Sequence, residues 1–324
     1  MRPFSCWQLI LFLALASPAW AGASPADASP EGLLKAGRAD EALHALSAEI
    51  QTHPENAAAY NLLCRTYFQL EIWDSAIKMA EKSIALEPRN SVYHQWLARA
   101  AGRKAETSNP FSAFGLARKV KAELERAVAL DGNNFSARTD LAEYYMEAPG
   151  FLGGDKNKAR QQAEAMAQDD PALAGYIHAR LEEKQGSGHA EEQYQKVITT
   201  GGDTSRYWVE LAYYYRRAGR HQDMESAIQS SLKAVHHDSI PEYDGAFLLL
   251  RTGRNFPEAV QMLRGYLSGE SPSEDGPAFR AHFLLGELLE KQGDRQHAAE
   301  EYRAALALAS QFRPARDALA RVSR

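Results

Sequence analysis

Cysteine is almost absent from this sequence of 324 residues, which has only Cys6 and Cys64. Cys6 lies in an N-terminal segment that we expect to be removed as a signal peptide. The mature chain then holds one cysteine and cannot form an internal disulfide. Stability must then come from packing, which a chain of this length can supply. Common catalytic and metal-site motifs are also absent, including H-E-x-x-H, C-x-x-C, G-x-x-x-x-G-K-[ST] and G-x-S-x-G. We therefore expect no enzyme activity, no cofactor and no metal site.

An excess of charge of one sign is lacking too. Lys and Arg total 37 and Asp and Glu total 42, which gives a net charge of −5. This mild acidity disfavours binding to nucleic acid or to an anionic membrane.

The adjacent pair His236-His237 would not share a helix face, so it does not indicate a metal site. After the N-terminal segment no apolar run approaches the roughly 20 residues that a membrane-spanning helix needs, so we expect no transmembrane segment.

The first 21 residues have the organisation of a secretory signal peptide. Met1-Arg2 gives a positive start, an apolar run of about ten residues follows, and Ala19-Trp20-Ala21 places small residues where a signal peptidase cleaves. The apolar run is too short to span a bilayer. We predict cleavage after Ala21, with cleavage after Ala23 as the alternative, and a flexible leader over residues 22–30. The mature chain is then exported, with a periplasmic location expected and secretion as the alternative.

A period of 34 residues organises residues 31–312. It separates Ala42 from Ala76 and Pro54 from Pro88. Within each period apolar residues recur at steps of three and four, which predicts two amphipathic helices. Such a period is typical of stacked helix-turn-helix units that bury each other's apolar sides. The sequence therefore predicts an all-α solenoid of about eight units.

Two units are longer than this period. The unit from Ser91 to Asn134 has about ten extra residues, and its turn-forming Thr107-Ser108-Asn109-Pro110 predicts an inserted loop near 104–113. The next unit contains one proline and three glycines that predict a second inserted loop over 148–154. Residues 313–324 follow the last unit, and we predict a capping helix there, because a final helix needs a polar outer face.

The repeat resembles the tetratricopeptide repeat, with its W-x2-L-G-x2-Y, A-x3-F and terminal proline. The first helix of the motif is matched by Trp208, Leu211, Ala212 and Tyr215, and its Leu-Gly pair by Leu285-Gly286. The second helix is matched by Ala42 with Leu46, Ala76 with Ala80 and Ala298 with Tyr302. The terminal proline is matched by Pro54, Pro88 and Pro171. The resemblance implies a right-handed superhelix that acts as an interaction scaffold and holds a peptide or protein segment in its concave groove.

The first helix of each unit should line that groove. Candidate contacts are the side chains that flank the buried anchors Leu63, Leu97 and Leu211. They are Asn61, Arg65, Phe68, Arg99, Arg103, Tyr213, Arg216 and Arg217. Arginine forks suit carboxylates and aromatic faces suit apolar side chains. An acidic zone with Glu143 and Glu147 should lie between two arginine zones. The alternative is that these arginines are solvated or paired with nearby acids.

Two further features leave alternatives open. Cys64 occupies a position where the repeat needs a small residue, so we predict core packing, with a reactive thiol or an intermolecular disulfide as alternatives. Phe151 and Leu152 either fold back on the neighbouring helices or contact a partner. The function we expect is an exported protein-binding scaffold. The alternative is an assembly or chaperone-like factor for cell-envelope proteins.

Overall fold

The computed structural model describes residues 28–235, 240–269 and 273–324. The predicted signal peptide, most of the predicted leader and the pair His236-His237 lie outside these residues. Within the described part the chain forms seventeen α-helices and one short 3-10 helix, and no strand. The predicted all-α fold is therefore confirmed.

Sixteen of the helices in the described part pair into eight successive hairpins, and a single helix follows them. Their bounds are α1 Pro30–Lys35 and α2 Ala39–Thr52, α3 Ala57–Gln69 and α4 Trp73–Leu86, α5 Ser91–Glu106 and α6 Pro110–Leu130, α7 Phe135–Glu147 and α8 Lys156–Glu164, α9 Pro171–Gln185 and α10 Ala190–Thr200, α11 Ser205–Arg217 and α12 His221–Lys233, α13 Ile240–Thr252 and α14 Phe256–Ser268, α15 Ala278–Lys291 and α16 Arg295–Leu308, and α17 Arg313–Val322. This is the predicted solenoid of eight units and a last helix.

Short polar side chains set many of the helix starts. Asn56, Asn109 and Asn134 each accept a hydrogen bond from a backbone N–H in the first turn of α3, α6 and α7, and Asp170 does the same for α9. Each bond satisfies one of the donors that a helix N-terminus leaves without an intrahelical partner. These helix starts are therefore encoded locally.

The expected loop near 104–113 is wrong. Only residues 107–109 separate α5 from α6, and the extra residues lengthen these two helices. The physical reason is that Asn109 and Pro110 act as the cap and first residue of α6, after which Ala, Leu, Arg, Lys and Glu favour continued helix. Between α7 and α8 the connection holds the 3-10 helix η1, Gly150–Leu152.

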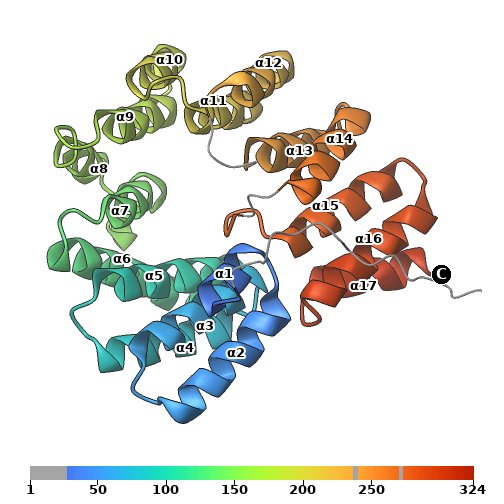
Figure 1. Cartoon of the computed structure of the whole chain (residues 1–324). Coiled ribbons are helices and arrows are strands. Elements are labelled where there is room, and N and C mark those ends of the chain that lie inside the picture. The colour runs from blue at the N-terminus through green and yellow to red at the C-terminus, as the bar shows by residue number, and fades with distance from the viewer. Residues whose placement is uncertain (1–27, 236–239, 270–272) are drawn as a thin grey trace, which may run out of the picture.

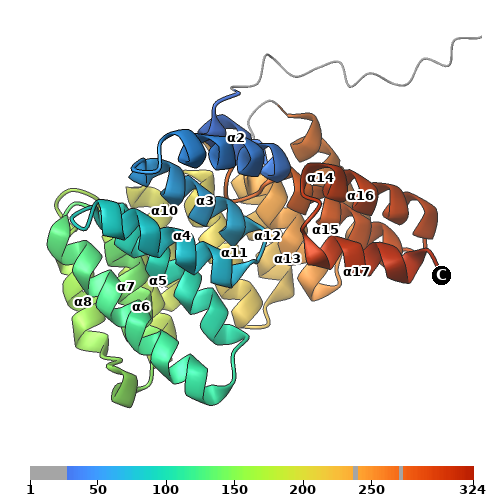
Figure 2. The same cartoon turned by 90° about the horizontal axis from the view of Figure 1, so that it is seen from below.

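The hairpins follow one another round a circuit, and the two ends of the array meet (Figure 1). The first helices of successive hairpins lie on the inner side and the second helices on the outer side. After the view is turned by 90°, α2 and α3 still lie beside the C-terminal hairpins (Figure 2). The solenoid is thus a closed ring, in contrast to an array in which each hairpin touches only its neighbours.

A shared apolar core joins the two ends of the ring. Leu46 and Leu63 from the N-terminal hairpins lie in one buried cluster with Phe279 and Phe312 from the C-terminal part. Phe279 is fully buried, and its ring packs edge-on against Phe312 at 5.0 Å between centroids. We call this contact between α1–α3 and α15–α17 the seam.

Polar contacts also cross the seam. The guanidinium of Arg280 donates to the backbone oxygen of Gln69 at 2.7 Å and to the Glu71 carboxylate at 2.9 Å. Asp40 accepts from the backbone N–H of Ser310 at 2.9 Å. Since these pairs lie more than 200 residues apart in sequence, the closure is a property of the tertiary structure.

No helix in the described ranges is long and apolar enough to cross a membrane. Nor do the described residues bring three His, Cys, Asp or Glu side chains together in a group that could hold a metal ion.

Candidate binding surface on the inner face

An aromatic zone occupies the inner face at α3–α5. The ring of Phe68 packs edge-on against Trp73 at 5.3 Å and against Trp96 at 5.4 Å. Arginines lie over the faces of the two tryptophans: Arg99 is 5.0 Å from the Trp96 centroid and Arg103 is 5.7 Å from that of Trp73. These contacts fix large, flat side chains in place, which is the kind of surface that anchors a partner's side chains.

The aromatic zone forms part of the wall of a pocket of about 260 Å³. We call it the seam pocket, because residues from both ends of the ring line it. Its walls are Phe68, Gln69, Trp73, Trp96, Arg103, Tyr243, Glu274, Asp275, Pro277 and Arg280. Burial raises the pKa of the Tyr243 hydroxyl to about 12, so this side chain is neutral at physiological pH.

A second pocket, of about 430 Å³, lies further round the inner face between α5, α7, α9 and α11. Acidic side chains outnumber basic ones in its walls, and we call it the acidic pocket. Asp140 is paired with Arg99, whose Nε lies 2.6 Å from the carboxylate, and Gln95 donates to the same carboxylate at 2.8 Å. Glu143 accepts from the Tyr176 hydroxyl at 3.2 Å. Glu210 has no hydrogen bond or ion pair with any residue in the described ranges.

The acidic pocket disfavours ionised carboxylates. Burial and the charge of Asp140 raise the pKa of Glu143, and burial and the charge of Glu143 raise the pKa of Glu210. Arginines nearby, including Arg206 and Arg217, only partly offset this effect. A bound cationic group would relieve it, so the pocket favours a positive side chain over a negative one.

Glu210→Gln should stabilise the protein at neutral pH. The folded-state pKa of Glu210 lies above its unfolded value, so the ionised carboxylate costs stability above that pKa. The cost disappears as the pH falls towards about 4.3, where the unfolded group is itself half protonated. Urea unfolding at a series of pH values should give the variant a higher midpoint than the wild type at pH 7–8, and the difference should shrink towards pH 4.

Glu183→Gln is the matched control, and its effect on stability at neutral pH should have the opposite sign. Burial acts to raise the pKa of Glu183, but hydrogen bonds and charge from Arg217, and the charge of Arg180, outweigh burial and lower it. Its ionised form therefore stabilises the fold above the unfolded pKa, and this contribution is lost as the pH falls. The variant should be less stable than the wild type at neutral pH. Two variants that shift stability in the same direction would contradict these electrostatic assignments.

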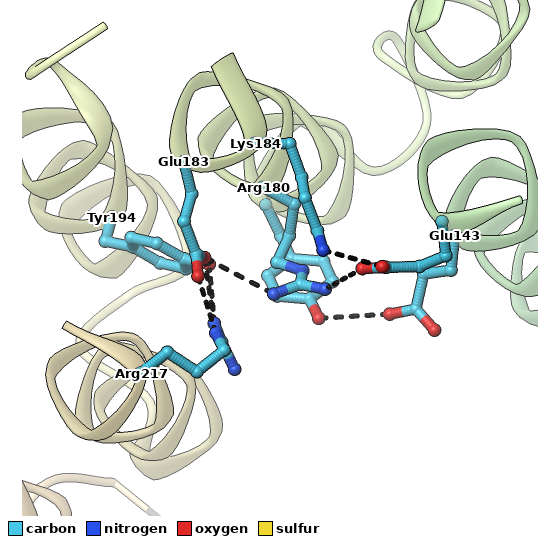
Figure 3. Close-up of polar contacts among 8 residues, drawn as sticks. Glu143, Arg180, Glu183, Lys184, Tyr194 and Arg217 are labelled. Carbon is cyan, nitrogen blue, oxygen red and sulfur yellow. Dashed lines mark hydrogen bonds and ion pairs between the residues drawn. The ribbon is translucent and has the colours of Figure 1, made fainter. Parts of the chain in front are cut away.

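Ion pairs tie the inner helices together beside the acidic pocket (Figure 3). Glu183 accepts from the Arg217 guanidinium at 2.6 and 2.9 Å and from the Tyr194 hydroxyl at 3.0 Å. Arg180 lies 3.3 Å from Glu183 on its own helix and 3.2 Å from Glu147 on α7. Lys184 donates to Glu147 at 2.6 Å. The network links α7, α9, α10 and α11, so these arginines already have partners.

The structure places most predicted contact residues on the inner face, where they form ion pairs, hydrogen bonds or ring contacts with other residues of the chain. Arg65 pairs with Glu274, Arg99 with Asp140, Arg103 with Glu106 and Arg217 with Glu183. The Tyr213 hydroxyl donates to Asp244 at 3.0 Å, Phe68 lies in the aromatic zone, and Asn61 is buried. Arg216 lies over the Tyr213 ring at 5.6 Å and makes no ion pair with the described residues. Among the predicted arginines, it is therefore the one whose charge is not already neutralised by a described residue.

An exposed apolar patch lies at the connection between α7 and α8. Phe151 is 78% exposed and stacks on Phe114, with centroids 6.4 Å apart. Phe111, one turn earlier on α6, is 93% exposed. Leu152 is partly buried, and its backbone oxygen accepts from the Tyr144 hydroxyl at 2.9 Å. The two predicted loop residues thus behave differently: the backbone of Leu152 is hydrogen-bonded to α7, and Phe151 stacks on α6 with most of its surface exposed.

Cys64 is a core residue. Its side chain is fully buried beside Ala76 and Ala80, and burial raises the pKa of the thiol to about 12. The thiolate, which is the reactive form, is therefore negligible at physiological pH. Core packing accounts for this cysteine.

Sequence reasoning missed several residues of the inner face. Trp96 and Trp73 were visible as apolar residues of the repeat, but their pairing with Phe68 depends on how two hairpins stack. Glu274 lies between the last two hairpins, where the repeat pattern assigns no role, and Arg280 lies in the first turn of α15. Only ring closure brings both residues to α3. Glu210 shows no sequence signal, because its environment is set by four different helices.

The fold and its inner surface define a helical-repeat solenoid whose inner face carries two pockets. Residues 33–100 and residues 245–311 each match a family model described as tetratricopeptide repeat. These two segments therefore match tetratricopeptide repeats, which generally mediate protein–protein interactions and typically form non-catalytic scaffolds. The first segment lies in the first three hairpins of the array and the second segment covers the last two.

The solved structures that are similar to this chain include two tetratricopeptide repeat proteins. A thermophilic tetratricopeptide repeat protein of Thermus thermophilus is 19% identical over 57% of this chain and 98% of its own, with a TM-score of 0.47. A tetratricopeptide repeat protein of Parabacteroides merdae is 15% identical over 83% of this chain and 99% of its own, with a TM-score of 0.42. No curated protein matches this chain.

Proposed function

We propose that this protein is an exported scaffold that binds a peptide or protein segment on the inner face of its ring. The observation that carries the proposal is that the inner face holds two pockets, the seam pocket with the aromatic zone in its wall and the acidic pocket between α5, α7, α9 and α11. Rigid aromatic anchors next to charged pockets are what a segment-binding surface requires.

The arrangement of charge supports an extended ligand with mixed character. Apolar side chains fit the zone around Phe68, Trp73 and Trp96, and a positive side chain fits the acidic pocket. Most arginines are already paired, so they hold the surface in shape, and a partner's carboxylate can reach Arg216 without breaking an ion pair among the described residues.

The proposal is tested by partner affinity. Crosslinking in the native compartment, followed by mass spectrometry, identifies the partner, and its affinity is then measured against purified variants. Replacing Arg99, Arg103, Arg216 and Arg217 with alanine should weaken binding by about tenfold or more, equivalent to about 1.4 kcal/mol. The single variant Arg216→Ala should also weaken binding, and it breaks no ion pair with a described residue.

The matched control replaces four exposed arginines that are not on the inner helices, namely Arg89, Arg126, Arg303 and Arg313. This control removes the same charge, so non-specific electrostatic attraction would be affected equally. Unchanged affinity of the inner-face variant for every partner would remove the proposal.

The second candidate is an assembly or chaperone-like factor for cell-envelope proteins. The exposed patch of Phe111, Phe114 and Phe151 favours it, because three large apolar side chains in contact with solvent suit transient contact with apolar segments. For this function, deletion of Phe151 and Leu152 should reduce activity more than any change on the inner face. Export itself is tested by fractionation and by N-terminal sequencing of the mature chain, which should begin after Ala21.

A further inference from the structure

We propose that the end of α3 around Arg65 and Gln69 is a binding site for an acidic peptide segment, and that residues 273–277 of the same chain occupy it in the structure. The inference rests on the proposed function and specifies the ligand of one part of the inner face. We call residues 273–277 the internal segment.

The internal segment meets α3 as a bound peptide would. Two nitrogens of the Arg65 guanidinium donate to the Glu274 carboxylate, Nε to Oε1 at 2.9 Å and Nη2 to Oε2. The Gln69 side-chain amide donates to the backbone oxygen of Glu274 at 3.0 Å. One residue is therefore recognised through its side chain and its main chain together. That combination is used to read extended acidic peptides, and a simple surface ion pair does not have it.

The contact is built from partly desolvated groups. The side chains of Arg65 and Glu274 are only 18% and 19% exposed. Burial acts to lower the pKa of Arg65, but hydrogen bonding to Glu274 and its charge outweigh burial and raise it. If the internal segment moved away, a mostly buried guanidinium would lose its counter-charge. Such a cation strongly favours another carboxylate, so the replacing ligand must be acidic.

A second observation points to a ligand at the same place. Gln69 is 5% exposed, and its Oε1 atom is fully buried with no hydrogen-bond partner among the described residues. Buried amide oxygens normally have partners. A segment that offered a main-chain N–H next to the recognised carbonyl would satisfy both ends of the Gln69 amide, which the internal segment does only in part.

The seam pocket extends this site. Glu274, Asp275 and Pro277 line it together with Phe68, Trp73 and Trp96. A partner with an acidic residue followed by an apolar side chain could place its carboxylate on Arg65 and its apolar group against the tryptophans. The internal segment has Gly276 and Pro277 there and leaves the pocket open, so a longer partner can make contacts that the internal segment lacks.

The probe is the acetylated and amidated pentapeptide Ser-Glu-Asp-Gly-Pro, which copies the internal segment. Its affinity is measured by calorimetry against the full mature chain and against Glu274→Gln. In the wild type, the tethered segment competes at high effective concentration, so binding should be weak. In Glu274→Gln the site is released, and affinity should rise about tenfold or more. The peptide Ser-Gln-Asp-Gly-Pro should bind neither chain.

Three further variants distinguish a binding site from an intramolecular contact that only stabilises the fold. Glu71→Gln removes the other carboxylate that meets an arginine at the seam, the partner of Arg280, and should behave as the wild type does. Glu274→Asp shortens the acid and should give an intermediate gain. Arg65→Ala added to Glu274→Gln should abolish the gain. Equal peptide affinity of wild type and Glu274→Gln, or a gain that survives Arg65→Ala, would overturn the inference.

Failure of the acidic site can be distinguished from failure of the proposed function. If the peptide results fail while the inner-face arginines still govern affinity for the crosslinked partner, only the acidic site is wrong. If the inner-face variants leave partner affinity unchanged, the proposed function is wrong. The peptide result still decides whether α3 binds an acidic segment.

Discussion

Gly37→Ala should open the ring and destabilise the protein by about 2–5 kcal/mol, the sum of positive-φ strain and overpacking. Gly37 lies at φ +69° in the turn between α1 and α2. A Cβ atom there would lie 2.3 Å from the backbone nitrogen of Ala278 and 2.9 Å from the carbonyl carbon of Pro277. Backbone atoms at the start of α15 cannot rotate away as a side chain can, so the two ends of the ring must separate.

Gly253→Ala is the matched control. Gly253 occupies the equivalent turn between α13 and α14 at φ +71°, and a Cβ atom there meets nothing within 4 Å. The strain of a positive φ alone costs about 1–2 kcal/mol. Small-angle scattering should give a larger radius of gyration for Gly37→Ala and an unchanged one for Gly253→Ala. Equal losses of stability and equal radii would mean that the ring is not closed in solution.

Phe279→Ala should cost about 3–5 kcal/mol of unfolding free energy. The ring of Phe279 is fully buried and shares its cluster with residues from α2, α3, α16 and α17. Its removal leaves a cavity in the core of the seam, where the two ends of the chain meet. Urea unfolding should show the loss, and hydrogen exchange should show reduced protection in α2 as well as in α15.

Two variants control this result. Phe279→Leu keeps most of the buried volume and should lose much less stability. Leu211→Ala opens a cavity of its own in the middle of the array and should cost about 2–5 kcal/mol. Because Leu211 lies far from the seam, α2 should keep its protection in that variant. Normal protection of α2 in Phe279→Ala would show that the seam core does not hold the N-terminal hairpins.

The repeat pattern predicted the fold well, because the interactions that set it are local. Ala42, Ala76 and Ala298 are all fully buried, as the small-residue positions require. The interpretation of Thr107-Ser108-Asn109-Pro110 shows the limit of local signals. Its turn chemistry does interrupt the helix, but the sequence could not show that the ten additional residues belong to helices on either side.

The inner surface was only partly predictable. Helical register brought Arg65, Arg99, Tyr213 and Arg217 to the correct face, but the sequence did not identify the carboxylates that pair with them. Three of these four partners lie on other hairpins, and one, Glu274, comes from the far end of the chain. The availability of a side chain for a ligand depends on such partners, so register alone overestimates how many arginines are free to bind.

By itself, the sequence determined the helices, their pairing into hairpins and the side that each hairpin turns inward, since these follow from periodicity, caps and small residues within 34 positions. Only the tertiary structure decided that the ends meet at Gly37, Phe279 and Glu274. Each hairpin adds a small rotation to the one before it, and closure depends on the sum over eight hairpins. No single stretch of sequence contains that sum.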